Sequence, residues 1–337
     1  MRYLVTGATG FLGGHLVRQL RERGHDVVAV CRGEAPELQR LGVQVVSGNV
    51  LDAASIERAA VGCDGLFHCA GLVSRRLADA DAMMKVHVDG TRVALDAVKR
   101  AGVKRAVVAS TSGTIAVSDK DETLAEDSPT PYALIGRWPY YRSKLYGEQA
   151  ALERNGSEFH VVCLNPSLLL GPGDVRGSST GDVRLFLESK VQAVPAGGMS
   201  FVDARDAAWA LIAAMEQGRP GERYLVSGCN CSVREFFGKL ERLSGVKGPW
   251  LPMPKSAELA RLAVRFMDKV ADRFGGKQAV DAETVDVAQH YWYCDGAKAA
   301  RELGFFPRDP METLRDTIAD LRERGVVWPA APRLGAA

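Results

Sequence analysis

The segment Tyr140-Tyr141-Arg142-Ser143-Lys144 holds the residue types with the clearest chemistry in this chain of 337 residues. Pro139 suits the first turn of a helix, and Asn155-Gly156 suits its end. Tyr140 and Lys144 then share one helix face. A free tyrosine, with a pKa of about 10, is a poor base at neutral pH, but a neighbouring ammonium favours the phenolate. The pair could therefore exchange a proton with a carbonyl or alcohol oxygen.

A Tyr-x-x-x-Lys spacing alone is usually a solvated helix face, so its meaning depends on other motifs. One is the run Thr6-Gly7-Ala8-Thr9-Gly10-Phe11-Leu12-Gly13, which follows the first predicted strand and opens the first predicted helix. Its glycines permit a tight turn, close approach of the backbone to a pyrophosphate, and packing of the helix on the sheet. The run predicts a dinucleotide site that includes Thr9, Phe11 and Leu12 beside the three glycines.

Arg32 bears on which dinucleotide binds. Folds that bind NAD place an acid on the ribose 2′-hydroxyl at the end of the second strand, whereas this chain has Val30-Cys31-Arg32 there. Arg32 could pair with a 2′-phosphate, which predicts NADP. NAD stays possible, because a surface arginine at a strand end is common and Glu34 is near.

The elements that must position these residues alternate along the first half of the chain. Apolar runs predict strands at 2–6, 27–31, 44–47, 65–69, 106–110 and 160–164, and amphipathic stretches between them predict helices, the longest at 79–100. Such alternation is typical of right-handed βαβ units. We therefore expect an α/β fold, a Rossmann-type doubly wound parallel sheet with a smaller C-terminal substrate-binding lobe.

The pattern loosens after Pro166. Helical patterns follow at 201–216, 232–244, 256–273 and 310–324, and the third has a wide apolar stripe that is either core packing or the wall of a lipophilic pocket. We expect the dinucleotide-binding domain to span 1–165, with 200–228 returning to it, and the substrate-binding lobe to comprise 166–199 and 229–330.

Composition excludes several classes of protein. Lys and Arg number 43 against 41 Asp and Glu, a net charge of +2 without a basic block, which argues against nucleic acid or an anionic membrane as the partner. No apolar run is long enough to span a membrane, and we expect no signal peptide. The seven cysteines predict free thiols in a reducing cytoplasm, and neither they nor the histidines have the spacing of a metal site.

Together these motifs resemble the extended short-chain dehydrogenase/reductase family, also described as the NAD-dependent epimerase/dehydratase family. The resemblance covers nearly the whole chain. Its further marks are Gly48-Asn-Val-Leu-Asp52, Phe67-His-Cys-Ala70, Val88-Asp-Gly-Thr91, Ser110-Thr-Ser112, Asn165-Pro-Ser167, Gly171-Pro-Gly-Asp174 and Phe201-Val-Asp-Ala-Arg-Asp206. Asn165-Pro-Ser167, Gly177-Ser-Ser-Thr-Gly181 and Gly221-Glu-Arg-Tyr224 are similar to the branch of dihydroflavonol reductases, which includes hopanoid-associated sugar epimerases.

The resemblance implies a role for each matching position. Thr111, flanked by Ser110 and Ser112, would bond the reacting oxygen, and Tyr140 would exchange the proton. Lys144 would hold the nicotinamide ribose. The remaining cofactor contacts would come from Gly7, Gly10 and Gly13 at the pyrophosphate, Asn49, Val50 and Asp52 at the adenine, Ala70 and Gly71 along the ribose, and Pro166 and Ser167 at the nicotinamide.

His87 departs from the family pattern, which usually has Asn before Val-x-Gly-Thr. In the family that Asn organises hydrogen bonds behind the active site, so a water-linked proton path through it is not expected to carry over directly. Either His87 substitutes as a donor, or it is a hydrogen-bonded core histidine.

Three functions are compatible with these observations. The leading one is an NADP(H)-dependent enzyme that reduces a ketone, or oxidises a secondary alcohol, of a small lipophilic or ring-containing substrate. The second is a nucleotide-sugar epimerase or dehydratase that retains its NAD(P). The third, a non-catalytic dinucleotide-binding protein, is disfavoured by the intact Thr111, Tyr140 and Lys144. A homodimer is possible by resemblance alone.

Overall fold

The computed structural model describes residues 1–253 and 282–328. Its main feature is a seven-stranded parallel sheet of order β3-β2-β1-β4-β5-β6-β9. The strands are β1 (Arg2–Thr6), β2 (Asp26–Cys31), β3 (Gln44–Ser47), β4 (Gly65–His68), β5 (Arg105–Ala109), β6 (His160–Pro166) and β9 (Arg223–Val226). The expected doubly wound parallel sheet is confirmed.

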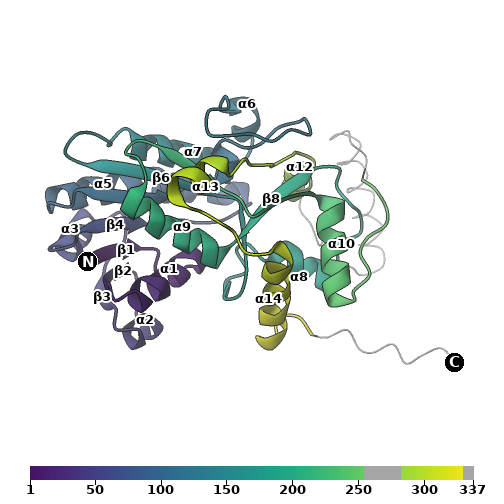
Figure 1. Cartoon of the computed structure of the whole chain (residues 1–337), viewed down its shortest axis with the longest axis horizontal. Helices are drawn as coiled ribbons and strands as arrows, with labels where there is room; N and C mark the ends of the chain where they lie inside the picture. Colours follow the sequence, from purple (N-terminus) through teal and green to yellow (C-terminus); the bar gives the residue numbers. More distant parts are fainter. Residues whose placement is uncertain (254–281, 329–337) are drawn as a thin grey trace.

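Helices cover both faces of this sheet (Figure 1). Side chains that alternate along each strand feed two separate cores: Val5, Ala29 and Val107 pack on one side, Leu4, Val28 and Val108 on the other. The first core takes in α1 (Phe11–Glu22), α2 (Pro36–Arg40), α9 (Ala204–Gln217) and α13 (Ala297–Leu303), and the second takes in α3 (Ala53–Ala60), α5 (Gly90–Arg100) and α7 (Pro139–Leu152). Because both faces are buried, the strands read as continuous apolar runs.

The single long helix expected at 79–100 is interrupted. A short 3₁₀ turn at Leu77–Asp79 leads into α4 (Ala80–Met84), and a π-helical turn at Lys85–Asp89 separates α4 from α5. Gly147 of α7 packs on this turn, where an added Cβ would lie 2.4 Å from the carbonyl oxygen of His87. The π turn therefore sets His87 against the helix that carries Tyr140.

A three-stranded sheet of order β10-β8-β7 forms the centre of the smaller lobe, at the right of Figure 1. Its strands are β7 (Leu168–Leu170), β8 (Gly198–Asp203) and β10 (Cys229–Ser232), and its helices are α8 (Gly181–Leu187), α10 (Val233–Ser244), α12 (Ala282–Ala288) and α14 (Pro310–Glu323). A short α6 (Tyr132–Ile135) precedes α7.

The helix expected at 201–216 begins later than predicted. Residues 201–203 finish β8, and Asp203 then caps α9 by accepting a hydrogen bond from the Arg205 amide. The apolar Phe201 and Val202 fit both the helical and the strand pattern of apolar residues. Pairing with β7 makes them part of a strand. The helix expected at 256–273 and its apolar stripe lie outside the described residues.

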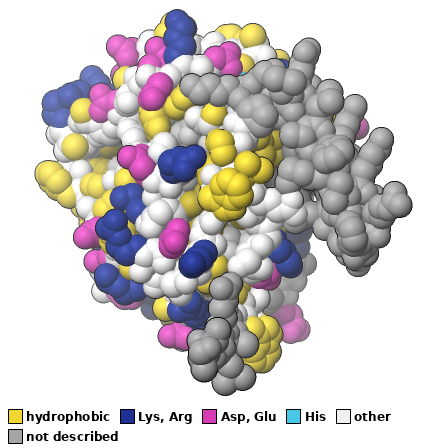
Figure 2. All heavy atoms as spheres, turned by 90° about the vertical axis from the view of Figure 1, so that its right-hand side faces the viewer, with side chains coloured by type: hydrophobic (Ala, Val, Ile, Leu, Met, Phe, Trp, Pro, Cys, Tyr) yellow, Lys and Arg dark blue, Asp and Glu magenta, His cyan; other side chains and the backbone are white. Residues whose placement is uncertain are grey.

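The surface carries no patch of a single charge on the face shown in Figure 2, where basic and acidic side chains are interspersed. All seven cysteines lie in the described part and are free, and five of them are buried. Within residues 1–253 and 282–328, no helix has the length and apolarity needed to cross a membrane.

Candidate active site

One large cleft runs along the carboxyl ends of the main strands and into the smaller lobe. Its volume is about 1790 Å³, larger than the range of about 300–1,000 Å³ that is usual for a single small ligand. The cleft is lined by Gly7, Thr9, Gly10, Phe11, Leu12, Gly13, Arg32, Asn49, Val50, Ala70, Gly71, Thr111, Tyr140, Lys144, Pro166 and Ser167. Fold and topology thus bring together all but one of the residues singled out in the sequence.

Asp52 is the exception. Its carboxylate caps α3, accepting from the amides of Ala54 at 3.1 Å and Ser55 at 3.3 Å. Leu51, rather than Asp52, joins Asn49 and Val50 along the cleft. An acid that precedes a helix by one residue satisfies otherwise unpaired amides, and the structure places Asp52 in that position instead of beside the cleft.

The turn between β1 and α1 has the shape that a pyrophosphate needs. Gly7 has a φ of +75°, and an added Cβ would lie 2.5 Å from the backbone of Cys69. A Cβ on Gly13 would lie 2.1 Å from the Gly7 carbonyl oxygen. Gly10 caps α1 without a side chain, and the first turn carries no acid. The helix therefore presents amides and the positive end of its dipole to the cleft.

The nicotinamide end of the cleft fits the same cofactor. Ser167, which directly follows β6, is buried, and its Oγ has no hydrogen-bond partner among the described residues. A buried hydroxyl is usually paired, so this one suits a polar group of a ligand. The glycine turn and the Ser167 hydroxyl both fit a nicotinamide dinucleotide, which would supply or accept the hydride.

Tyr140 and Lys144 lie on one face of α7, and both face the cleft. The Lys144 Nζ donates to the carbonyl oxygen of Ala109, at the end of β5, over 2.6 Å. Burial lowers the pKa of Lys144, and the nearby Glu148 carboxylate opposes that shift. Strand β5 thus fixes the position of the ammonium group.

The pKa of Tyr140 differs from the expectation. Burial raises it above the ordinary value, and Tyr141 adds to the shift. The sequence predicted that the Lys144 ammonium would favour the phenolate, but in the structure desolvation of Tyr140 dominates. The phenol therefore keeps its proton at neutral pH, as a proton donor must.

Thr111 is the hydroxyl best placed for a ligand among the three neighbours at the end of β5. Ser110 Oγ donates to the buried Glu148 carboxylate, and Ser112 is buried. Thr111 Oγ1 makes only a long contact, 3.4 Å, with the Gly113 amide. Asn165 Nδ2 donates to the Thr111 carbonyl oxygen over 3.1 Å and holds this backbone in place.

His87 is fully hydrogen-bonded in the core. Its Nε2 accepts from the Leu72 amide over 3.0 Å, which leaves the proton on Nδ1 to bond Ser143 Oγ over 2.8 Å. Burial lowers the pKa of His87 to about 2. Its ring packs edge-on against Tyr140, with centroids 5.9 Å apart. Of the two roles open to it, the geometry favours that of a core histidine that supports the tyrosine.

The wall of the cleft beside Tyr140 is aromatic. The ring centroids of Tyr141 and Trp292 are 4.6 Å apart, those of Tyr140 and Tyr141 are 5.1 Å apart, and both Tyr141 and Trp292 line the cleft. Gly113 makes room for this pair, because an added Cβ would lie 2.3 Å from the Tyr141 ring. Of Tyr291-Trp292-Tyr293, only Trp292 reaches the cleft.

The smaller lobe contributes mostly apolar side chains to the cleft, and several of its cations are paired. The apolar lining includes Leu168, Met199, Val233, Phe236, Phe237 and Met253. Arg184 and Lys190 share Glu188, at 3.7 and 2.6 Å, and Arg75, which reaches the cleft from the segment after β4, lies 3.4 Å from Asp182 of α8. Arg176 is exposed on the loop beyond β7.

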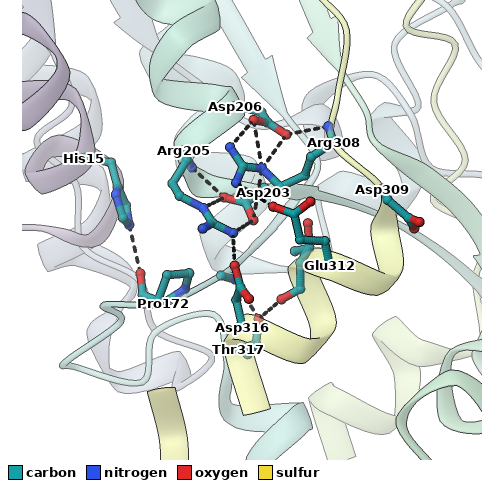
Figure 3. Close-up of polar contacts among 12 residues, drawn as sticks. His15, Pro172, Asp203, Arg205, Asp206, Arg308, Asp309, Glu312, Asp316 and Thr317 are labelled. Atoms are coloured by element: carbon teal, nitrogen blue, oxygen red, sulfur yellow. Dashed lines mark hydrogen bonds and ion pairs between the residues drawn. The ribbon is translucent and has the colours of Figure 1, made fainter. Parts of the chain in front are cut away.

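A network of ion pairs joins α14 and the residues just before it to the end of β8 and the start of α9 (Figure 3). Arg205 binds Asp203 over 2.7 Å and Asp316 of α14 over 2.6 Å, and Arg308 binds Asp206 over 2.8 Å. In the same region His15 Nε2 of α1 donates to the Pro172 carbonyl oxygen over 2.8 Å. The loop that bounds the cleft is therefore tied to the helix of the glycine turn.

Half-buried Tyr140 and Lys144 at the end of a glycine-turn cleft are typical of a dinucleotide-dependent oxidoreductase. Residues 3–227 match the model of the family described as "NAD dependent epimerase/dehydratase family". The chain belongs to this family, the extended short-chain dehydrogenase/reductases, and is an NAD(P)-dependent enzyme. Within the residues that the structure describes, no group of His, Cys, Asp or Glu side chains could hold a metal ion.

Individual relatives have diverse names. The chain is 31% identical to "Sterol demethylase protein B" of Methylococcus capsulatus. The alignment covers 97% of this chain and the whole of that protein. The chain is also 32% identical to a "Putative dihydroflavonol 4-reductase" of Synechocystis. That alignment covers 94% of this chain and 92% of the relative. The structure of this chain is similar to MoeE5 in complex with UDP-glucose and NAD, with a TM-score of 0.72, 25% identity and coverage of 96% of this chain and 99% of that one.

Two groups of residues in the site escaped the sequence analysis. Glu148 follows Lys144 by four residues, a spacing that places it on the same helix face, but nothing in the sequence indicates that it is buried. Tyr141 and Arg75 line the cleft, where they contact Trp292, Asp182 and Thr284, and Gly113 lies behind the Tyr141 ring, next to Trp292. Such contacts join segments more than 100 residues apart, which periodicity does not report.

Proposed function

We propose that the protein is an NADP(H)-dependent oxidoreductase that reduces a ketone, or oxidises a secondary alcohol, of a small lipophilic or ring-containing substrate. The observation that carries this proposal is the substrate half of the cleft. Beside Tyr140 it is aromatic and apolar. Of the cations that line it, Arg75, Arg184 and Lys190 already pair with carboxylates, and the remaining one beyond β7, Arg176, is a single exposed side chain. A diphosphate would need unpaired cations that converge on it.

In the proposed reaction, Thr111 Oγ1 and the Tyr140 hydroxyl bond the substrate oxygen. Tyr140 gives its proton to that oxygen as hydride reaches the carbon, and the reverse steps oxidise an alcohol. Lys144 holds the nicotinamide ribose and stabilises the phenolate that remains. The protonated phenol, whose pKa desolvation raises, supports the reductive direction.

NADP is the proposed cofactor, with NAD as the alternative. Arg32 directly follows the last residue of β2, is exposed, and lines the cleft. There it could bond a 2′-phosphate. Glu34 also lines the cleft, and an acid near the ribose is the feature that keeps NAD as the alternative.

The second candidate function is a nucleotide-sugar epimerase or dehydratase with retained NAD(P). The similarity to MoeE5, bound to UDP-glucose and NAD, favours it. Mass spectrometry of the nucleotide that co-purifies separates the two functions, since an epimerase keeps NAD and a reductase has an exchangeable NADP site.

The decisive experiment follows NADPH oxidation with a panel of aromatic and alicyclic ketones, together with calorimetry of UDP- and GDP-sugars. We expect turnover of at least one ketone and no measurable binding of a nucleotide sugar. Micromolar binding of a nucleotide sugar with no ketone reduced would overturn the reductase in favour of the epimerase.

Three further expectations stay proposals. The first is the division into a dinucleotide-binding domain (1–165 with 200–228) and a substrate-binding lobe (166–199 with 229–330), which limited proteolysis can test. The others are a homodimer, to be tested by light scattering, and a cytoplasmic location, to be tested by cell fractionation.

A further inference from the structure

A buried acid lies behind the proposed catalytic pair. Glu148 follows Lys144 by one turn of α7 and is only 2% exposed. Its Oε2 accepts from Ser110 Oγ and from Asn165 Nδ2, the latter over 2.5 Å, and its Oε1 accepts from Arg223 over 3.3 Å. Since these neighbours are all donors, the geometry suits a carboxylate that acts only as an acceptor.

A small cavity is bounded by both this acid and the lysine. It has a volume of about 10 Å³, and its walls include Lys144, Glu148 and Ser110. A volume of about 10–15 Å³ holds one water when two or more polar groups surround it. A water here can accept from the Lys144 Nζ and donate to the Glu148 carboxylate.

The two histidines on the cavity wall are already engaged. His87 uses both ring nitrogens, as described above. His68 pairs through Nδ1 with Thr6 Oγ1 at 2.8 Å and through Nε2 with Thr91 Oγ1 at 3.1 Å. Burial lowers the pKa of His68 to about 3 and that of His87 to about 2, so both rings are neutral at pH 7.

Glu148 is therefore the group whose charge can stabilise the ammonium from this side. The other titratable or charged groups around Lys144 and its cavity are Tyr140 on α7, His68 and Cys69 at the end of β4, His87 on the π turn, Cys163 on β6 and Arg223 on β9. Burial raises the pKa of both thiols, which leaves them neutral.

We propose that Glu148 is a positioning residue of the Tyr140–Lys144 pair, and that through one water in this cavity its carboxylate keeps the proton on the Lys144 Nζ. The inference rests on the proposed function in so far as that pair performs the reaction. Lys144 donates one N–H to Ala109 and one to the water, and the water donates one O–H to Glu148. No bond to hydrogen is broken in this resting arrangement.

The first test needs neither substrate nor cofactor. The ¹³Cε resonance of Lys144, assigned by its loss in Lys144→Arg, reports the titration of the ammonium group in lysine-labelled protein. An opposite charge within about 4–6 Å shifts a pKa by about 1–3 units, so Glu148→Gln should lower the Lys144 pKa by about that amount. Glu148→Asp, which keeps the charge, should restore most of it.

Two more variants separate the charge from the packing. Thr114 Oγ1 lies 3.0 Å from Glu148 Oε2, so Thr114→Val disturbs the same network without removing a charge and should leave the Lys144 titration in place. Arg223→Met removes the cation that competes with Lys144 for Glu148, so it should raise the Lys144 pKa. This variant provides a second test in case Glu148→Gln does not fold. If the Lys144 titration is unchanged in Glu148→Gln, the proposal is overturned. If Glu148→Gln does not fold, an unchanged Lys144 titration in Arg223→Met overturns it instead.

The second test uses turnover of a ketone from the panel. Glu148→Gln should move the alkaline limb of the kcat/KM profile to lower pH, whereas a merely structural role would lower kcat/KM equally at every pH. If no ketone is reduced, the proposed function fails while the titration of Lys144 still decides the role of Glu148.

Discussion

At the scale of single residues, Tyr140 combines a place in the cleft with a phenol that keeps its proton, because burial raises its pKa. The Lys144 ammonium group is fixed by Ala109 at 2.6 Å, which places it where a ribose hydroxyl can bind. In the proposed reaction these two side chains have separable tasks. Substitution can distinguish them.

Tyr140→Phe should abolish turnover and leave cofactor affinity nearly intact, because it removes the proton donor and little volume. Lys144→Ala should impair both turnover and cofactor binding. Initial rates of NADPH oxidation and fluorescence titration of the cofactor measure the two effects. Tyr146→Phe, at an exposed position of the same helix, is the control and should behave as wild type. Near wild-type turnover in Tyr140→Phe would refute the assignment.

Arg32→Ala should weaken NADPH binding more than NADH binding. A lost charge-assisted hydrogen bond costs about 1.5–3 kcal/mol, or roughly ten- to a hundred-fold in the dissociation constant. Calorimetry with both cofactors measures the difference, and Arg40→Ala, at an exposed position of α2 that does not line the cleft, is the control. Equal losses for both cofactors would show that Arg32 does not bind the 2′-phosphate.

At the scale of elements, the ends of strands and helices decide which side chains reach the cleft. The carboxyl ends of β1, β4, β5 and β6 all open onto it. The start of α3 does not, although the sequence places Asp52 only two residues after Val50. Capping of a helix and packing of aromatic rings are local effects, and each allows a test.

Asp52→Ala should lower the free energy of unfolding by about 1 kcal/mol, the usual cost of a lost helix cap, without changing the dissociation constant of the cofactor. Denaturant unfolding and calorimetry measure the two quantities. Asp52→Asn, which can still cap, should retain most of the stability. A clear loss of cofactor affinity would instead return Asp52 to the adenine site.

Gly113→Ala should reduce kcat/KM for ring-containing ketones, because the added Cβ displaces the Tyr141 ring from Trp292. The dissociation constant of the cofactor should stay the same. Gly156→Ala is the matched control, since a Cβ there meets no atom within 4 Å. Unchanged kinetics in Gly113→Ala would show that the aromatic wall does not contact the substrate.

At the scale of the whole molecule, residues next to both sheets line the cleft, so its shape depends on the contacts that join the two lobes. Asp203 is at the centre of the contacts that join β8 and α9 to α14 (Figure 3). Burial opposes the charge of Asp203, but hydrogen bonds from Arg205 and the charge of Arg308 hold its pKa below the ordinary value. The ion pairs therefore connect stability to pH.

Asp203→Asn should lower the free energy of unfolding at pH 7 by about 3 kcal/mol, the lower end for breaking a buried ion pair. Because the pKa of Asp203 is lower in the folded than in the unfolded state, its stabilisation is complete at neutral pH and is lost as pH falls below about 4. Wild type and variant should therefore converge in acid. Thermal unfolding between pH 3 and 7 measures this, and a constant difference across that range would contradict it.

The sequence by itself determined six of the seven strands of the main sheet, the glycine turn and the register of Tyr140 and Lys144, whereas β9 was not predicted. Each depends on short-range regularities: apolar runs for buried strands, glycines where a Cβ cannot fit, and the 3.6-residue period of a helix. The family followed from the same motifs in order. For this reason the predicted strands agree with the observed ones to within two residues at each end.

Only the tertiary structure decided how those residues are surrounded. Burial, rather than the neighbouring lysine, sets the pKa of Tyr140, and contacts with Leu72 and Ser143 make His87 a core residue. The Asp52 carboxylate caps α3, Glu148 is buried behind Lys144, and Trp292 packs on Tyr141 from a segment about 150 residues away. Desolvation and long-range packing depend on distances between segments that the linear order does not fix, so this part of the site could be established only from the folded chain.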